Sequence, residues 1–292
     1  MKIFVTGASG FVGSAVVKEL IGAGHSVIGL ARKEDSAKIV HDAGAEVLMG
    51  DIEDPNVLRK GATSADGIIH TAFIHDFTQY AKAAGVDKTA INAMGEVLRG
   101  TKKPIIVTAG TLGLPLINGT ITEESLSKNS PRFSEDAALS LAEQGVNASV
   151  IRLPPSVHDK GDGGFIPFII QMAKTNGLSA YPDEGKNRWP SVHRLDAAKL
   201  FRLAVEKSEK GALYNAIGDN GIETKQIAEL IGKTLNLPVR SLSGEEIEKH
   251  FTWMSRFIGF DSPATAKKTQ ELLGWTPTHI GLLEDMKLNY FN

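Results

Sequence analysis

The first half of the chain alternates between short apolar runs rich in β-branched residues and longer segments with apolar residues at helical spacing. The short runs predict buried strands, and the longer segments predict amphipathic helices. The expected strands are Lys2–Thr6, Ser26–Leu30, Glu46–Met49, Gly67–Thr71, Pro104–Thr108 and Ala148–Leu153. The expected helices between them are Phe11–Ala23, Ser36–Asp42, Asn56–Gly61, Phe77–Arg99 and Ser134–Gln144, with left-handed cap residues at Gly24 and Gly145. This alternation predicts the α/β class, with a doubly wound parallel sheet covered by helices on both faces.

The regular alternation ends after Leu153, where Pro154-Pro155 and two glycine-containing loops follow. Helical spacing returns in Phe165–Lys174, Leu195–Lys207, Lys225–Leu235, Glu245–Phe257 and Ala264–Leu273, with strand-like runs at Leu213–Ile217 and Val239–Leu242. We therefore expect residues 154–292 to form a smaller substrate-binding lobe. Segments near 192–217 are expected to return to the main sheet.

A glycine-rich turn joins the first predicted strand to the first predicted helix. It consists of Gly7, Ser9, Gly10, Phe11, Val12 and Gly13 with their neighbours. The first glycine permits the tight turn, the second lets a pyrophosphate approach the backbone, and the third permits close packing of helix and strand. The helix dipole and its N–H groups face the phosphates. Residues 1–153 are thus predicted to be a dinucleotide-binding domain of the Rossmann type.

The second predicted strand ends in Ala31-Arg32-Lys33. An NAD site has an acidic residue about 20 positions after the turn, which holds the ribose hydroxyls. Arg32 instead offers a guanidinium that suits a 2′-phosphate, and the expected cofactor is NADP(H). The alternative is that Arg32 is a solvated residue paired with Glu34 or Asp35.

Composition excludes several other classes. The chain has 292 residues, 32 basic and 34 acidic residues and a net charge of −2, so no basic surface for nucleic acid or anionic lipid is expected. It has no cysteine, which excludes disulfides and thiolate chemistry. No metal-ligand spacing occurs, and no apolar run approaches the ~20 residues of a membrane span. Met1 leads directly into the first strand, so we expect no signal peptide and a cytoplasmic location.

Several motifs occur in a fixed order along the chain: residues 6–13, Gly50-Asp51-Ile52, His70-Thr71-Ala72-Phe73, the stretches 152–158 and 161–162, residues 192–198 and Leu273-Gly274-Trp275-Thr276-Pro277. Together they resemble the extended short-chain dehydrogenase/reductase superfamily, in its NAD-dependent epimerase/dehydratase-like branch. The resemblance implies that Asp51 and Ile52 lie beside the adenine and that Thr71, Ala72 and Phe73 pass the cofactor. It also places Thr108, Pro154 and Pro155 in the cofactor site. Members of the family often pair through the helices that correspond to 77–99 and 134–144, so a homodimer is expected.

The sequence departs from this family at the chemistry. Family reductases carry a Tyr-x-x-x-Lys pair, in which the tyrosine protonates the substrate oxygen and the lysine lowers the pKa of the phenol. The corresponding stretch here is Ser130-Pro131-Arg132-Phe133-Ser134-Glu135, with Glu135 at the lysine position. Arginine cannot replace the phenol because it does not release its proton. The usual proton relay is therefore missing.

Other residues are candidates for the catalytic roles. Thr111, or else Thr108, is placed to hydrogen-bond a substrate carbonyl, with bonding to local backbone as the alternative. His158 stands at the edge of the expected pocket and titrates near neutrality, which makes it the first candidate proton donor. Tyr80 and the neighbours His75 and Asp76 are the rival donors. Trp189 is expected to line the substrate entrance or to cap the lobe.

These observations predict an NADP(H)-dependent oxidoreductase that reduces a small carbonyl or conjugated carbonyl compound with a non-standard proton donor. Two alternatives remain open at this stage. One is a non-catalytic NADP(H)-sensing regulator that has kept the cofactor fold, and the other is an epimerase/dehydratase-like enzyme. Fold alone does not separate them, because function depends on the site.

Overall fold

Each strand of the N-terminal half presents alternate side chains to two opposite layers of helices. In the computed structural model, which describes residues 1–75, 79–126 and 132–291, these layers enclose a parallel sheet. The elements in chain order are β1 (Lys2–Thr6), α1 (Phe11–Gly22), β2 (Ser26–Ala31), α2 (Glu34–Asp42), β3 (Glu46–Met49), α3 (Pro55–Thr63), β4 (Gly67–His70), α4 (Tyr80–Leu98), β5 (Pro104–Gly110), α5 (Ser134–Glu143) and β6 (Asn147–Leu153). The predicted strands are confirmed, with ends that shift by one or two residues.

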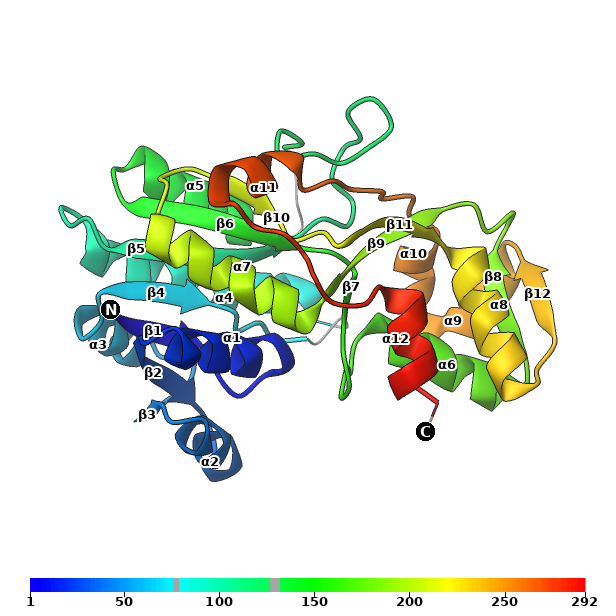
Figure 1. Ribbon diagram of the computed structural model, residues 1–292, viewed down its shortest axis with the longest axis horizontal. Coiled ribbons are helices and arrows are strands. Elements are labelled where there is room, and N and C mark those ends of the chain that lie inside the picture. The colour runs from blue at the N-terminus through cyan, green and yellow to red at the C-terminus, as the bar shows by residue number, and fades with distance from the viewer. Residues whose placement is uncertain (76–78, 127–131, 292) are drawn as a thin grey trace.

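The sheet order places β1 in the middle, as in dinucleotide-binding folds. Within the described residues the seven strands run β10-β6-β5-β4-β1-β2-β3, and all neighbours pair in parallel. Chain order therefore reverses between β1 and β4, which opens a crevice at the carboxyl ends of these strands. The predicted doubly wound α/β fold is confirmed (Figure 1).

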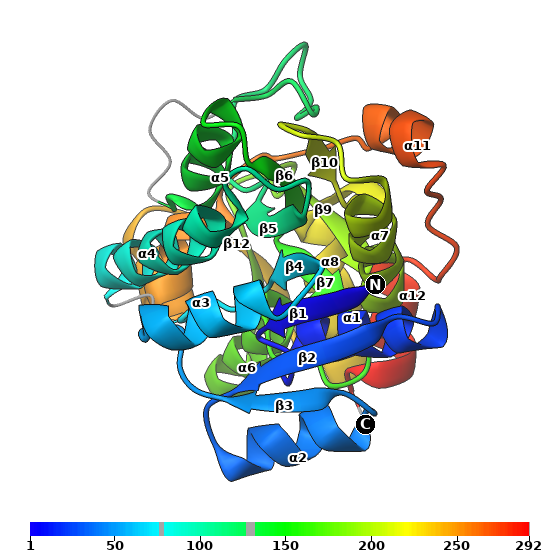
Figure 2. The same cartoon turned by 90° about the vertical axis from the view of Figure 1, so that its left-hand side faces the viewer.

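Two hydrophobic layers hold the sheet. Ile3 and Val5 of β1 pack with α1 and with α7 (Arg194–Lys207) on one face, whereas Phe4 packs with α3, α4 and α5 on the other. This division follows from the two-residue period of a strand. Figure 2 shows the two sets of helices on opposite sides of the sheet. Gly24 and Gly145 have the left-handed conformation predicted for cap residues, with φ of 84° and 91°.

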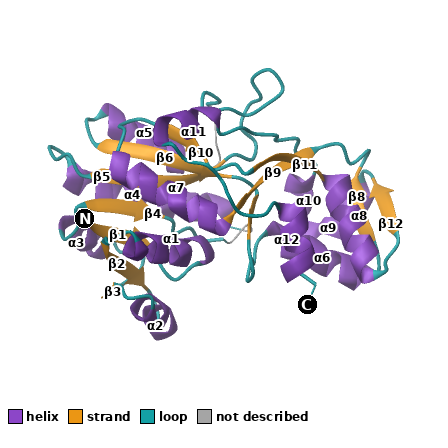
Figure 3. Ribbon diagram, viewed as in Figure 1, coloured by secondary structure: helices purple, strands orange, loops and turns teal. Residues whose placement is uncertain are grey.

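The C-terminal half builds a separate, mainly helical lobe beside the carboxyl edge of the sheet (Figures 1 and 3). Its elements are β7 (Ser156–His158), α6 (Phe165–Asn176), β8 (Ser179–Pro182), β9 (Arg188–His193), β11 (Asp219–Glu223), α8 (Thr224–Leu235), β12 (Val239–Leu242), α9 (Glu245–Phe251), η1 (Thr252–Met254), α10 (Ser255–Ile258) and α12 (Leu282–Asn289). A third hydrophobic cluster, which includes Trp189, Phe251 and Met286, fills this lobe.

Three segments of the C-terminal half return to the N-terminal domain. Helix α7 packs on α1, β10 (Leu213–Asn215) extends the sheet beyond β6, and α11 (Lys267–Leu273) packs against α7 and β10. Trp275 is buried in the same layer and donates its indole N–H to the carbonyl of Asp196 at 2.9 Å. The lobe and the domain are therefore connected by several chain crossings.

Some sequence-based element assignments were wrong. The single helix expected over Glu245–Phe257 is divided into α9, η1 and α10, because Thr252 has a left-handed φ of 51°. The helix expected from Ala264 begins only at Lys267, since Ala264 forms an isolated parallel β-bridge with Ile121. Helix α4 begins at Tyr80, and residue 77, where its start was expected, lies outside the described residues. Within the part of the chain that the structure describes, no helix has the length and apolar character needed to span a membrane.

Candidate functional site

The three glycines of the turn between β1 and α1 have different surroundings. Gly7 has a φ of 69°, and a Cβ atom there would lie 2.8 Å from the backbone N of Ala72. A Cβ atom on Gly13 would lie 2.0 Å from the carbonyl oxygen of Gly7. Gly10 is exposed, and its Cβ atom would meet only that carbonyl oxygen at 3.1 Å. Gly7 and Gly13 are therefore required by the fold, whereas Gly10 leaves open space above the turn.

The N-terminus of α1 is suited to an anion. Gly10 is the cap residue, and no side chain caps the helix among the described residues. The first N–H groups of an uncapped helix need an acceptor, and the helix dipole favours a negative one. Ser9, Phe11 and Val12 are half-buried around this point. A dinucleotide pyrophosphate fits the open space and the donor groups together.

In addition to the helix dipole, a positively charged side chain lies at this point, and it was not predicted from the sequence. Arg194, the first residue of α7, places its guanidinium 4.6 Å from the ring centroid of Phe11. Two hydrogen bonds to Asp159 Oδ2, of 2.8 and 3.1 Å, hold the guanidinium there. Only the proximity of β7, α7 and α1 brings these residues together, so neither spacing nor local pattern could identify Arg194.

The expected adenine side of the site lies at the ends of β2 and β3. The Arg32 side chain is 63% exposed, and its Nη1 lies 3.6 Å from Asp51 Oδ2. Asp51 and Ile52 are half-buried. Glu34 and Asp35 lie in the first turn of α2, and the ion pair that the structure shows for Arg32 is with Asp51. The exposed guanidinium is thus directed away from the sheet core, beside the residues expected to contact adenine.

A chain of buried hydrogen bonds runs from β1 into the start of α5. Thr6 Oγ1 bonds to His70 Nδ1 at 2.6 Å, and His70 Nε2 bonds to Asp87 Oδ1 at 3.0 Å. Ser134 Oγ donates to Asp87 Oδ2 at 2.5 Å and accepts from Arg132 Nε at 2.8 Å. Burial by itself raises the pKa of Asp87, but the hydrogen bond with His70 and the neighbouring positive charges bring it below its ordinary value. Asp87 is therefore a carboxylate that anchors the start of α5 to the sheet.

Arg132 lies at the end of this chain, at the carboxyl edge of the sheet. Its Nη2 donates to the Thr108 carbonyl at 3.0 Å, and its guanidinium carbon lies 4.2 Å from the ring centroid of Phe73. The rings of Tyr80 and His75 also contact Phe73, with centroid distances of 5.8 and 5.4 Å. Burial raises the pKa of the Tyr80 phenol, and the Arg132 charge opposes that rise. These polar groups lie around Phe73, the residue that follows Thr71 and Ala72.

Glu135, at the expected lysine position, is not available to a ligand. Glu135 is 6% exposed, and its carboxylate forms an ion pair with the fully buried Arg152 of β6. Arg152 also donates to the carbonyl of Ser125 at 2.7 Å. This pair fastens the start of α5 to β6 and to the segment before it.

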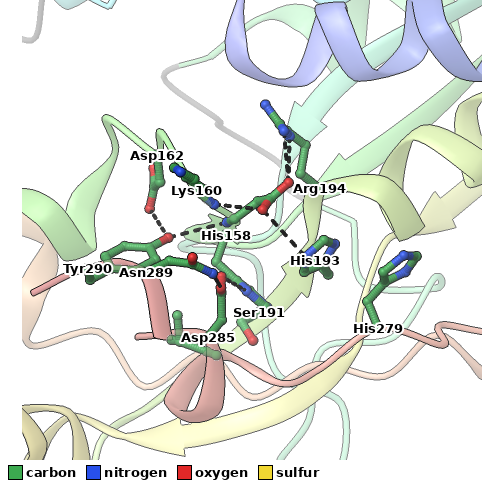
Figure 4. Close-up of polar contacts among 12 residues, drawn as sticks. His158, Lys160, Asp162, Ser191, His193, Arg194, His279, Asp285, Asn289 and Tyr290 are labelled. Carbon is green, nitrogen blue, oxygen red and sulfur yellow. Dashed lines mark hydrogen bonds and ion pairs between the residues drawn. The ribbon is translucent and has the colours of Figure 1, made fainter. Parts of the chain in front are cut away.

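The proposed donor His158 lies below the surface. It is 1% exposed, and its Nδ1 is hydrogen-bonded to Asp285 Oδ2 of α12 at 2.8 Å. Its ring packs edge-on against His193, which stacks on His279 with a centroid distance of 4.5 Å. Figure 4 shows His158 among polar residues of β9, of α12 and of the segment that follows β7. This burial leaves His158 almost no surface for a substrate, whereas Tyr80 is only half-buried.

The other predicted residues are mostly buried. Thr111 is fully buried, and its hydroxyl has no hydrogen-bond partner among the described residues. Thr108 Oγ1 donates to the His70 carbonyl at 2.7 Å. Pro154 is buried and Pro155 half-buried between β6 and β7.

The placement of Trp189 at the substrate entrance was wrong, because its side chain is fully buried in the core of the lobe. Asp76 lies outside the described residues, and no metal-binding cluster occurs among those described.

This geometry defines an α/β protein of the Rossmann type. Residues 3–98 match the model of the NAD dependent epimerase/dehydratase family. The chain is 47% identical to an uncharacterised protein of Schizosaccharomyces pombe across 98% of each chain. It is 24% identical, over 80% of its length and 73% of the relative's, to a 4-hydroxy-2-methyl-3-oxo-4-farnesyl-3,4-dihydroquinoline-1-oxide ketoreductase of Stigmatella aurantiaca. Its fold matches a dTDP-glucose 4,6-dehydratase of Streptomyces venezuelae with NAD bound, with a TM-score of 0.78, 18% identity and coverage of 99% and 96%. The chain belongs to the epimerase/dehydratase family of oxidoreductases.

Proposed function

We propose that this protein is an NADP(H)-dependent reductase of a small carbonyl or conjugated carbonyl compound. The observation that carries the cofactor assignment is Arg32, which stands exposed at the end of β2 where an NAD site has a carboxylate. A guanidinium binds a phosphate through two parallel hydrogen bonds, and no carboxylate can do so. The name of the Stigmatella aurantiaca relative, a ketoreductase, supports carbonyl reduction.

The residues around the glycine turn would hold the cofactor phosphates. The N–H groups at the start of α1 would bind the pyrophosphate in the space above Gly10, with Arg194 as a nearby positive charge. Asp51 and Ile52 would contact the adenine, and Thr71, Ala72 and Phe73 would border the nicotinamide half. When bound, NADPH supplies a hydride for the substrate carbon.

The protein must then supply a proton for the substrate oxygen. We assign this role to Tyr80 rather than His158, because Tyr80 is half-buried beside Phe73 and His158 has almost no exposed surface. Thr111 would need a local change of structure before it could contact a substrate, since it is fully buried. Tyr80 thus remains as the residue of α4 that borders the expected nicotinamide site.

The test combines binding and turnover. Calorimetric titration with NADPH and NADH measures cofactor choice, and oxidation of NADPH is then followed at 340 nm with a panel of aldehydes, ketones and enones. The proposal predicts tighter binding of NADPH and turnover of at least one carbonyl compound. Binding of NADPH without turnover of any of them would favour the alternative of a cofactor-sensing regulator. Failure to bind either dinucleotide would overturn both assignments.

A further inference from the structure

Three side chains from separate segments meet at Phe73, just after β4. Arg132 lies over the face of this ring at 4.2 Å, Tyr80 of α4 contacts it at 5.8 Å, and His75 contacts it edge-on at 5.4 Å. The preceding residue, Ala72, borders the position that a Gly7 side chain would occupy, at 2.8 Å. The cluster therefore begins immediately beside the glycine turn. It lies at the edge of the sheet where a ligand of this fold binds.

The position of Arg132 is fixed by contacts on several sides. Its Nη2 is held by the Thr108 carbonyl at the end of β5, and its Nε by Ser134 Oγ. Ser134 is fully buried and is itself held by the Asp87 carboxylate, which is 1% exposed. A guanidinium with two directed hydrogen bonds and an aromatic ring against its face loses most of its rotational freedom. The positive charge is thus preorganised rather than solvated.

Arg132 and Tyr80 contact the same ring, that of Phe73. Burial raises the pKa of Tyr80 above its ordinary value, the charge of Arg132 opposes part of that rise, and the charge of Asp87 adds to it. Burial also lowers the pKa of Arg132, but an arginine remains charged in proteins. A positive charge near a phenol favours the phenolate, and so makes the phenol a better proton donor. Arg132 cannot donate the proton itself.

We propose that Tyr80 and Arg132 form the proton-donating pair of this protein, with Tyr80 as the general acid and Arg132 as the fixed cation that stabilises its phenolate. The inference rests on the proposed function. The Tyr80 O–H bond breaks as its proton moves to the substrate oxygen, which has become an alkoxide through addition of a hydride to the carbon. The resulting phenolate lies near the Arg132 guanidinium until it takes a proton from water. Substrate thus gains one hydride and one proton, and Tyr80 is restored.

This pair differs in chain position from a tyrosine and lysine on one helix. Tyr80 is the first residue of α4, whereas Arg132 precedes α5. The two are brought together by Phe73 and by the hydrogen-bond chain through Asp87 and Ser134. A guanidinium also offers directed donors on a plane, so an anionic substrate oxygen could share it with the phenolate.

The test measures the ionisation of Tyr80 directly, without cofactor or substrate. Protein labelled with ¹³Cζ-tyrosine has four tyrosine signals, from Tyr80, Tyr181, Tyr214 and Tyr290, and Tyr80→Phe assigns one of them. Arg132→Gln is expected to raise the pKa of the Tyr80 signal, while Arg132→Lys, which keeps the charge, is expected to leave it close to wild type. Unchanged positions of the other three signals show that the fold is intact. A Tyr80 pKa that does not respond to Arg132→Gln would overturn the pair.

A second measurement uses the wild-type chain and therefore does not depend on the folding of a variant. Because Tyr80 is half-buried, salt screens the Arg132 charge in part, and 1 M NaCl is expected to raise the pKa of its signal. A fall with salt would contradict the assignment of the cation.

In turnover, Tyr80→Phe should lower kcat about 10²–10⁴-fold with little change in NADPH affinity. If NADPH does not bind, the proposed function is wrong. If NADPH binds and is oxidised, but Arg132→Gln leaves the pKa of the Tyr80 signal unchanged, only the proposed pair is wrong.

Discussion

Glu135 and Arg152 form a buried ion pair that is joined by two hydrogen bonds of 2.6 Å each, from Nε to Oε2 and from Nη2 to Oε1. Arg152 is fully buried and Glu135 is 6% exposed. The geometry is the parallel, two-bond arrangement that gives arginine–carboxylate pairs their specificity. A carboxylate at the family's lysine position is therefore not a substitute for that lysine. It is committed to the attachment of α5 to β6.

Removal of Glu135 should destabilise the fold. Glu135→Ala leaves a buried guanidinium without its counter-charge, and we expect the free energy of unfolding to fall by about 3–5 kcal/mol. Glu135→Lys should be at least as harmful, because it places two positive charges together, and it should not create a reductase dyad. Urea denaturation followed by circular dichroism measures the change. Glu143→Ala, an exposed position in the same helix, is the control and should change stability little.

Gly10→Val should abolish cofactor binding in a protein that remains folded. The added side chain would occupy the open space above the turn, where its Cβ atom meets only the Gly7 carbonyl. Calorimetry with NADPH tests binding, and thermal denaturation tests the fold. Gly13→Val is the contrasting variant, because its side chain would overlap the turn itself, and it should fail to fold stably. Normal NADPH affinity in folded Gly10→Val would exclude the turn as the phosphate site.

Arg32→Ala should remove the preference for NADPH over NADH. A hydrogen bond to a charged group contributes about 1.5–3 kcal/mol, so we expect NADPH affinity to fall tenfold or more and NADH affinity to change little. Lys33→Ala is the matched control, since Lys33 is the exposed neighbour that precedes α2. Calorimetric titration of both cofactors against the three proteins gives the comparison. Equal affinities for the two cofactors in wild type would contradict the assignment of NADP(H).

Acidification below neutrality should weaken the start of α7 through His193. Its Nδ1 accepts a hydrogen bond from the N–H of Leu195 at 3.2 Å, which requires that nitrogen to be unprotonated. Burial, together with the neighbouring imidazoles, lowers the pKa of His193 below its ordinary 6.5. Neutral His193 therefore contributes its full stability above pH 6.5, and the contribution is lost as the pH falls through the lowered pKa.

The measurement is thermal denaturation of wild type and His193→Ala at pH 8 and pH 5. Loss of the cap should cost about 1 kcal/mol at pH 8 and less at pH 5. His41→Ala, whose imidazole side chain is 80% exposed, is the control for a histidine without such a role. The same cost of His193→Ala at both values of pH would show that protonation does not act through this cap.

Local sequence determined the N-terminal domain well because its signals are local. A strand that is buried on both faces, a turn with Gly7 and Gly13 and a helix that begins at Phe11 are each specified by neighbouring residues, and sterics at the turn permit no other residue type. The parallel sheet then follows from the order of strands and helices. In the lobe the same reasoning missed β7, β8, β9, β11 and α12, because these elements are short and their pairing partners are distant in the chain.

The roles of individual polar residues were decided only by the tertiary structure. The sequence favoured His158 over Tyr80 as the proton donor, but packing of α12 on β7 buries the imidazole against Asp285, while Tyr80 stays half-buried. Likewise, only the tertiary structure places Arg132 against Phe73, the ring that Tyr80 also contacts, and holds it there through Ser134 and Asp87. Hydrogen bonds and charges act over a few ångströms of space, and residues about 50 positions apart in the chain acquire such distances only through folding.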